Sequence, residues 1–205
     1  MEEIEVVIAT RNAGKLLEIQ SILAPLGLKI ISLSHFPEIP EIIEDGQTFE
    51  ENAVKKAVAV ARQTGRIAIA DDSGLAVDAL HGRPGVFSSR YAGENATDAD
   101  RYRKLLKEMA EIPQRKRGAA FICAIAVASP EGKTETVEGQ CHGEIAPTPR
   151  GSHGFGYDPV FYLPELGKTM AELDPEVKNR ISHRARALER LKSILPKFIQ
   201  EKMAE

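Results

Sequence analysis

The 205-residue chain lacks the features that define several protein classes. It has only two cysteines, Cys123 and Cys141, with no Cys-x-x-Cys pair and no histidine at zinc-finger spacing, so neither a disulfide framework nor a structural zinc site is predicted. No apolar run approaches the ~18 to 20 residues that cross a bilayer, and the first residues are acidic where a signal peptide would be basic. We therefore expect a cytoplasmic protein, away from the membrane, with reduced cysteines in strands.

A basic excess is missing as well. The chain has 27 basic and 30 acidic side chains, a formal net charge of −3, which argues against binding DNA or RNA through bulk phosphate neutralisation. A protein with this net charge can still bind small anionic ligands. Hydrophobic residues make up 42% of the chain, and no repeat, low-complexity tract or linker interrupts it. We expect one domain, residues 1–205, which can have two lobes.

Hydrophobic spacing predicts alternating strands and helices. Thr48 and Glu51 form a capping-box pattern and Gly65 is a stop signal, which together predict a helix over about 49–64. Further helices are expected after Lys15, over 97–110 and from Ser182 onward. Pro196 is expected to end or kink the last one. Strands are expected at 4–9, 28–33, 67–70, 119–128, 134–146 and 159–163, with those at 119–128 and 134–146 forming a hairpin.

Residues 10–15 form a polar turn between the first strand and the first helix. Backbone N–H groups at a helix N-terminus, with Arg11 and Lys15 nearby, can hold phosphate oxygens. The segment is not a Walker loop, because that pattern needs glycine at Ala9 and a hydroxyl residue at Leu16. An ordinary strand-to-helix turn is the alternative for this segment taken alone.

Two adjacent acids, Asp71 and Asp72, follow the buried strand at 67–70. Neighbouring carboxylates repel unless a cation or donors compensate them, which makes a Mg²⁺ site plausible; a simple Asp-Gly turn is the alternative. The preceding acidic loop contains Glu41, Glu44 and Asp45. One of them could supply a further oxygen ligand, or all three could be solvated loop charges.

Two later segments could hold the rest of a ligand. In residues 152–159, glycines on both sides of Phe155 let the backbone approach a flat ligand while the ring stacks on it. A glycine-rich turn with core aromatics is the alternative. Near the last helix, His183 and Arg184 fall in the first turn, where positive charge opposes the macrodipole and an anion or electron-rich ligand would relieve it. A solvated basic helix start is the alternative there.

Taken together and in this order, these segments resemble the inosine triphosphate pyrophosphatase family, which hydrolyses non-standard purine nucleoside triphosphates. The stretches that carry the resemblance are residues 9–15, 44–53, 70–75, 84–91, 154–159 and 182–184. The resemblance implies a mixed α/β fold with a long curved central sheet and two lobes, the active site in the cleft between them, and a homodimer. The implied reaction converts ITP, dITP or XTP and water to the nucleoside monophosphate and pyrophosphate with Mg²⁺ as cofactor.

The resemblance also implies roles for individual residues. Asp72 would be both a metal ligand and the proton acceptor, and Glu44 would be the second metal ligand, with Glu41 as a less favoured substitute. The substrate contacts implied are Thr10, Arg11, Asn12, Ala13, Gly14, Lys15, Ser73, Phe155, Gly156, Tyr157, Asp158, Lys178, His183 and Arg184. Residues 10–15 and Lys178 would contact the phosphates. Residues 155–158 would hold the base, with His183 and Arg184 completing its pocket, and Ser73 would be a further substrate contact.

Selectivity would depend on the 6-position of the purine. Hypoxanthine and xanthine present a keto oxygen there, so an Arg184 donor would be left unpaired by adenine. Guanine shares the keto oxygen, so its rejection needs a further feature of the pocket. Two other classes remain open at this stage: a non-catalytic purine nucleotide-binding protein, which the clustered acids disfavour, and a single-stranded nucleic-acid binder, which the charge disfavours.

Overall fold

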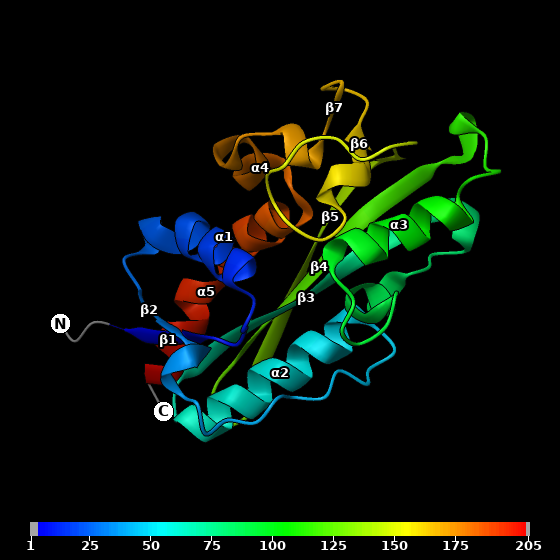
Figure 1. Cartoon of the computed structure of the whole chain (residues 1–205). Helices are drawn as coiled ribbons and strands as arrows, with labels where there is room; N and C mark the ends of the chain where they lie inside the picture. The colour runs from blue at the N-terminus through cyan, green and yellow to red at the C-terminus, as the bar shows by residue number, and fades with distance from the viewer. Residues whose placement is uncertain (1–3, 204–205) are drawn as a thin grey trace. The chain divides into compact units, whose positions relative to one another are not determined.

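The computed structural model describes residues 4–203, and its elements alternate much as the sequence predicts (Figure 1). The helices are α1 (Ala13–Leu23), α2 (Phe49–Thr64), α3 (Asp98–Glu108), α4 (Pro175–Ile181) and α5 (His183–Met203). The strands are β1 (Glu5–Ile8), β2 (Lys29–Ser32), β3 (Ile67–Val77), β4 (Gly118–Ala128), β5 (Thr134–Ile145), β6 (Phe161–Leu163) and β7 (Lys168–Thr169).

The strands form one seven-stranded mixed sheet in the order β2-β1-β3-β4-β5-β6-β7. Strand β1 runs parallel to both β2 and β3, whereas β5, β6 and β7 pair in antiparallel fashion. Strands β4 and β5 are sheet neighbours joined by a tight turn in which Ser129 N–H donates to the Lys133 carbonyl at 2.9 Å. The mixed α/β class and the predicted hairpin are therefore confirmed.

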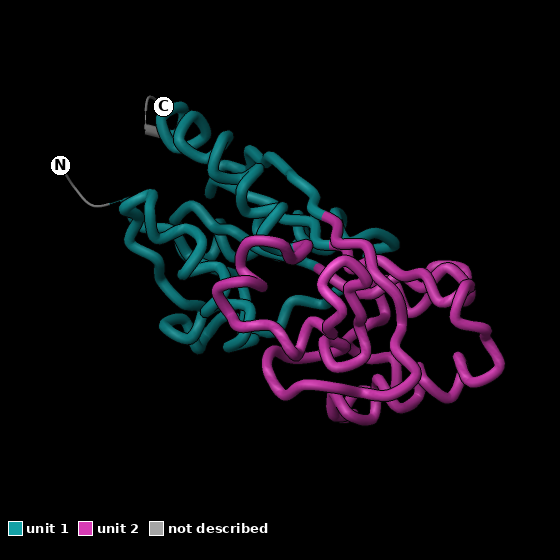
Figure 2. Tube along the Cα trace, turned by 90° about the horizontal axis from the view of Figure 1, so that it is seen from above, with its two compact units in different colours: residues 1–72, 123–139, 184–205 teal, residues 73–122, 140–183 magenta. Residues whose placement is uncertain are grey.

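The chain divides into two compact units (Figure 2). Unit 1 comprises residues 1–72, 123–139 and 184–205, and unit 2 comprises residues 73–122 and 140–183. The boundary falls within β3, β4 and β5, so each of these strands contributes residues to both units. The described residues of each unit have a hydrophobic core of their own.

Unit 1 places helices on both faces of its strands. Side chains at Ile67 and Ile69 of β3 pack in one cluster with α1 and α5, whereas those at Ala68 and Ala70 pack in another with α2. Figure 1 shows the same arrangement, with α1 and α5 on one side and α2 on the other. Consecutive strand residues point to opposite faces. The two isoleucines therefore meet α1 and α5, and the two alanines meet α2.

Helix α2 confirms the prediction made from its capping pattern. Thr48 Oγ1 accepts the N–H of Glu51, the Glu51 carboxylate accepts the N–H of Thr48, and Gly65 ends the helix at φ 64°. A left-handed φ of this kind suits glycine. Helix α3 begins in the same way at Thr97, with Asp100 as the returning acid.

Unit 2 has a core formed by β3, β4, α3 and the chain around β6. Its buried side chains include Leu75, Leu105, Phe121 and Phe161, and the rings of the last two lie 4.3 Å apart. Buried Arg117 donates to the carbonyl oxygens of Met109, directly after α3, and of Ile145 and Ala146 at the end of β5. These bonds give the buried guanidinium its hydrogen-bond partners and connect the end of α3 with the end of β5.

Several predicted boundaries are wrong. The strand expected to end at Ala70 continues to Val77, so Asp71 and Asp72 lie inside β3 and not in a turn beyond it. Of the two outcomes expected at Pro196, an end or a kink, the first is not found, because α5 continues to Met203. Phe198 and Ile199, buried past this proline, each stabilise the fold by about 1.5–3 kcal/mol, which offsets the ~3 kcal/mol that a proline costs inside a helix. Helix α4 and strand β7 were not predicted.

The two cysteines lie in strands, as predicted. Cys123 in β4 and Cys141 in β5 are both buried thiols outside any disulfide. Within residues 4–203, no helix is both long and apolar enough to span a bilayer.

Candidate active site

The polar segment between β1 and α1 is organised by its own side chains. Thr10 Oγ1 accepts the N–H of Asn12 at 3.2 Å, and Asn12 Oδ1 in turn accepts the N–H of Lys15 at 3.0 Å, which makes Asn12 the N-cap of α1. The first N–H groups of a helix have no partner within it, so they and the macrodipole favour an anion at this end. The start of α1 is therefore a candidate position for an anion, and its predicted contact with phosphate stays a prediction.

Arg11 in this loop has a different partner. Its guanidinium donates to the carbonyl of Ile39 at 2.6 Å, which fixes the segment that leads to the acidic loop. The structure therefore gives Arg11 a contact within the protein, and its predicted contact with phosphate stays a prediction.

The two adjacent acids point to opposite faces of β3. Asp71 continues the face of Ile67 and Ile69, which packs on α1 and α5, and Asp72 continues the face of Ala68, which packs on α2. Strand geometry alone requires this separation, since neighbouring side chains alternate. The repulsion expected between the two carboxylates is thereby reduced, and each acid has its own set of partners.

Asp71 lies in a buried charge network, which we call the Asp71 network and which consists of Asp71, Lys15, Arg184 and Glu18. Asp71 Oδ2 accepts from Arg184 Nη2 at 2.9 Å and lies 3.0 Å from Lys15 Nζ, and Arg184 Nη1 donates to Glu18 Oε2 at 2.5 Å. Burial opposes ionisation of Asp71, but attraction to Lys15 and Arg184 outweighs it and holds the pKa of this carboxyl well below its usual range. Asp71 thus fixes the position of the Lys15 ammonium group in the first turn of α1.

Asp72 faces α2, where Asn52 and Lys56 lie one helical turn apart. Asn52 Nδ2 donates to Asp72 Oδ2 at 3.0 Å, and Lys56 Nζ lies 3.8 Å from Asp72 Oδ1. Lys56 also pairs with Glu44 and donates to the backbone carbonyl of Asp71 at 2.7 Å. Burial raises the pKa of Asp72, the positive charge of Lys56 opposes that rise, and the negative charge of Glu44 adds to it.

Asn52 and Lys56 were missed by sequence reasoning. Both are buried, and both flank the stripe of alanines with which α2 packs on the sheet. A polar pair at i and i+4 beside an apolar helix face was the available signal. Asn52 Oδ1 also accepts the N–H of Gly46 at 2.8 Å, and a Cβ at Gly46 would lie 2.6 Å from that oxygen, so the acidic loop is held against α2.

The donor set around Lys56 fits a hard divalent cation. Glu44 and Asp72 both approach the Lys56 ammonium group, which shows that these two carboxylates converge on one positive charge. Mg²⁺ is commonly bound by one or two carboxylates together with substrate phosphates and water. Within residues 4–203 no cluster of three or more acidic, histidine or cysteine side chains surrounds such a position. Glu44 is partly buried and contacts Lys56, whereas Glu41 is exposed, and the choice of Glu44 as metal ligand stays a prediction.

The glycine-rich segment of unit 2 forms a tight turn held by Asp158. The Asp158 carboxylate accepts the N–H of Phe155 at 2.9 Å and the ammonium of Lys178 at 2.5 Å, and Lys178 Nζ lies 4.6 Å from the centre of the Phe155 ring. Gly154 adopts φ 75°, and a Cβ there would lie 2.0 Å from Asp158 Oδ2. Only glycine permits this approach. We call residues 154–158 the Phe155 turn.

The remaining predicted residues lie in β3, in α4 and at the start of α5. Lys178 belongs to α4 and not to the last helix, and its described contacts are with the Phe155 turn of unit 2. His183 is buried, with its ring stacked on Phe121 at 4.7 Å between centres. Ser73 is partly buried in β3, directly after Asp72. Arg184 contacts two carboxylates of the Asp71 network, so a contact of this residue with the purine stays a prediction.

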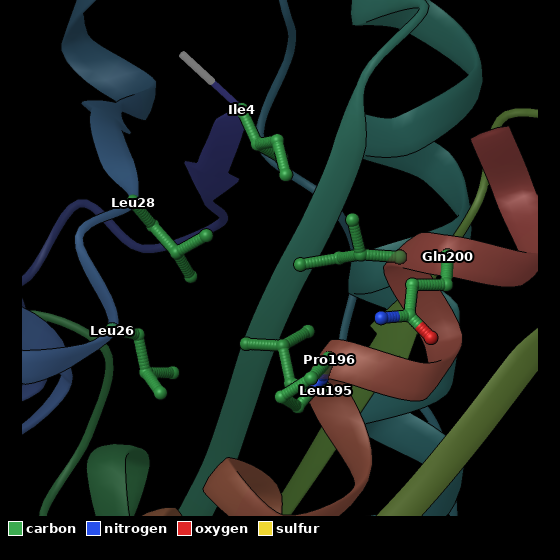
Figure 3. A pocket seen from close by; sticks show the side chains of 7 residues that line it. Ile4, Leu26, Leu28, Leu195, Pro196 and Gln200 are labelled. Atoms are coloured by element: carbon green, nitrogen blue, oxygen red, sulfur yellow. The ribbon is translucent and has the colours of Figure 1, made fainter. Parts of the chain in front are cut away.

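One hollow in unit 1 has the wrong chemistry for a charged substrate. It has a volume of about 200 Å³ and is lined by Ile4, Leu26 and Leu28 together with Leu195 and other residues of α5 (Figure 3). None of its lining residues carries a charge. It is therefore unsuited to hold a triphosphate, and none of the predicted site residues lines it.

Comparison with known proteins agrees with the ordered motifs. The sequence model of the Ham1 family matches residues 6–194. The chain belongs to the Ham1 family. A dITP/XTP pyrophosphatase of Geobacillus kaustophilus is 58% identical over 187 residues, which is 91% of this chain and 92% of that relative. The dITP/XTP pyrophosphatase of Geobacter sulfurreducens is 57% identical over 189 residues, 92% of this chain and 95% of the relative.

Solved structures of Ham1 proteins have the same fold. The HAM1 protein of Coxiella burnetii superposes with a TM-score of 0.86 at 48% identity, covering 95% of this chain and 99% of that one. The Ham1 protein of Staphylococcus aureus gives a TM-score of 0.84 at 42% identity, covering 94% and 98% of the two chains. The resemblance found in the sequence is thus confirmed at the level of family and fold.

Proposed function

We propose that this Ham1-family chain hydrolyses the non-standard purine nucleoside triphosphates dITP, ITP and XTP to the monophosphate and pyrophosphate. The observation that carries the proposal is the division of charge around β3: Asp71 supports Lys15 on one face, and Asp72 converges with Glu44 on the other. The two relatives described above, which are named dITP/XTP pyrophosphatases, support the same reaction.

The triphosphate is held by the start of α1. Backbone N–H groups of Ala13 and Gly14 and the side chains of Thr10 and Asn12 surround its oxygens, and Lys15 adds a positive charge that Asp71 keeps in place. Lys178 is a further proposed phosphate contact. Fixing the phosphates in this way aligns the bond between the α- and β-phosphorus atoms for in-line attack, which accounts for much of the catalysis of phosphoryl transfer.

Glu44 and Asp72 would hold a divalent cation, which we propose to be Mg²⁺. Such an ion, when bound, neutralises charge on the phosphates and on the departing pyrophosphate. Asp72 orients the attacking water and accepts its proton, because its carboxylate is buried beside Asn52 with one oxygen already fixed by a hydrogen bond. Lys56 keeps Glu44 and Asp72 within reach of one another.

The purine is held by the Phe155 turn. The ring of Phe155 stacks on the base, and Gly156, Tyr157 and Asp158 shape the surrounding backbone. His183 and Arg184 complete the pocket and distinguish a keto oxygen from the amino group of adenine, as the family resemblance implies. Ser73 is a further substrate contact.

The test is a product assay with ITP, XTP, dITP, ATP and GTP in the presence of Mg²⁺. We expect pyrophosphate and the monophosphate from the first three substrates, with much slower turnover of ATP and GTP. Orthophosphate with a diphosphate product, or equal use of ATP, would contradict the proposal. The matched variants Glu44→Gln and Glu41→Gln test the metal site, and only the first is expected to raise the Mg²⁺ concentration that half-maximal activity requires.

A non-catalytic nucleotide-binding protein is the alternative, and no observation favours it. The proposal also includes a homodimer located in the cytoplasm, as the resemblance and the sequence composition imply. Size-exclusion chromatography with light scattering tests the homodimer, and fractionation of cells tests the location in the cytoplasm.

A further inference from the structure

Asp98, the first residue of α3, contacts the Phe155 turn although 58 residues separate it from Gly156. Its Oδ2 accepts the N–H of Gly156 at 2.7 Å, and its Oδ1 accepts from Arg101 Nη1 at 2.5 Å. Both carboxylate oxygens are thus engaged, one by the turn and one by a cation on the same helix. Arg101, whose side chain is more buried than that of Asp98, fixes the direction in which the carboxylate points.

Asp98 is not needed to cap its own helix. Thr97 Oγ1 accepts the N–H of Asp100, and the Asp100 carboxylate accepts the N–H of Thr97, so the capping box is complete without Asp98. The bond to Gly156 is therefore additional to the local structure of α3.

Gly156 finds its hydrogen-bond acceptor outside the turn. It adopts φ 64°, and its N–H donates to Asp98 and not to the Asp158 carboxylate that binds the N–H of Phe155. Tyr157, the next residue, is held by a donation from its hydroxyl to the Ser88 carbonyl at 2.9 Å. Asp158 thus fixes the turn from inside, while Asp98 and Ser88 fix it from outside.

We propose that Asp98 is a positioning residue for purine binding: by accepting the N–H of Gly156 it fixes the orientation of the Phe155 ring without touching the substrate itself. This inference rests on the proposed function, because it assigns the base to the Phe155 turn. A charge-assisted bond of this kind is stronger than a neutral one, and it holds the ring before the base arrives.

The test compares Asp98→Ala with Asp100→Ala in the full chain. Both variants remove one acid from the first turn of α3, but only the first removes the acceptor of Gly156. We expect Asp98→Ala to raise the KM for ITP about tenfold, a difference of about 1.4 kcal/mol, with kcat nearly unchanged. Asp100→Ala lowers the melting temperature without this change in KM, and Asp98→Asn, which keeps an acceptor oxygen, restores most of the low KM.

A second measurement does not depend on catalysis. Amide hydrogen exchange at Gly156, followed by NMR in the free protein, should speed up in Asp98→Ala and stay unchanged in Asp100→Ala. Arg101→Gln, which leaves the acceptor but removes its orienting cation, should give a smaller increase and serves if Asp98→Ala does not fold.

The outcomes separate this inference from the proposed function. A wild-type chain that does not hydrolyse ITP overturns the proposed function, whereas the exchange of Gly156 still decides whether Asp98 anchors the turn. A wild-type chain that hydrolyses ITP, combined with unchanged KM and unchanged exchange in Asp98→Ala, overturns the role of Asp98 alone. Equal increases of KM in Asp98→Ala and Asp100→Ala would overturn it as well.

Discussion

The two units build their functional residues by different means. In unit 1 the residues are charged and compensate one another, as in the Asp71 network and in the set of Lys56, Glu44 and Asp72. In unit 2 the Phe155 turn is shaped by glycines and by backbone N–H groups that donate to carboxylates. A triphosphate with its metal ion needs fixed charges, whereas a flat base needs a rigid apolar surface, so the difference follows the chemistry of the two ends of the proposed substrate. Two proposed contacts are exceptions: Lys178 of unit 2 contacts phosphate, and Arg184 of unit 1 contacts the base.

This contrast predicts that changes in unit 1 affect turnover or stability, and changes in the Phe155 turn affect KM. The largest effect is expected for Asp72→Asn, which keeps the size of the side chain but removes its negative charge. Loss of the proton acceptor lowers kcat for ITP by at least about 10³-fold, as measured by pyrophosphate release. Asp45→Asn, a change at an exposed acid of the same acidic loop, is the control and should leave kcat nearly unchanged. Turnover of Asp72→Asn at the wild-type rate would remove Asp72 from the mechanism.

Arg184→Met should mainly reduce stability. This buried guanidinium compensates Asp71 and Glu18, and removal of one partner from a buried ion pair costs about 3–5 kcal/mol. Urea denaturation measures the loss, and Arg186→Met, at an exposed arginine of the same helix, is the matched control. Because Arg184 is also proposed to contact the purine, the variant should lose part of its preference for ITP over ATP. Normal stability would contradict its role in the Asp71 network, and an unchanged preference would contradict its contact with the purine.

Phe155→Leu should act on substrate binding. Stacking of an aromatic side chain on a base contributes about 1–3 kcal/mol, so loss of the ring raises the KM for ITP about tenfold or more while kcat changes little. Phe87→Leu replaces an exposed phenylalanine of the same unit and should not change KM. A fall in kcat with constant KM would break the proposed contrast between the units.

The smallest effect is expected for Glu5→Gln at the start of β1. Hydrogen bonds from Lys29 and Arg66 lower the pKa of Glu5 to about 2, from 4.5 for an unperturbed glutamate. A lowered pKa means that the ionised side chain contributes stability above pH 4.5, which is lost as the pH falls toward 2. Thermal melts should show a slightly lower melting temperature for Glu5→Gln at pH 7, and the two melting temperatures should converge near pH 2. A difference in melting temperature that stays constant from pH 7 to pH 2 would contradict the lowered pKa of Glu5.

Local signals predicted much of the fold. The bounds of α2 follow from Thr48, Glu51 and Gly65, which all lie within one turn of a helix end. The hairpin of β4 and β5 follows from two β-prone runs on either side of a tight turn. The motifs predicted the family, and they also supply several residues of the proposed site, among them Lys15, Asp72 and Phe155. Lys56, Asn52 and Asp98 were not predicted, because each acts through a partner that lies far away in the chain.

The sequence by itself determined the bounds of α2 and the capped start of α3, most of the strands, and the family to which the chain belongs. Only the tertiary structure decided that β3 continues past Ala70, which sends Asp71 toward α1 and α5 and Asp72 toward α2. Arg184 meets Asp71 across 113 residues and Glu18 across 166. The physical reason is range: a helix cap is decided by bonds within about four residues, whereas the partner of a buried charge depends on strand alternation and on the helix that packs against that face.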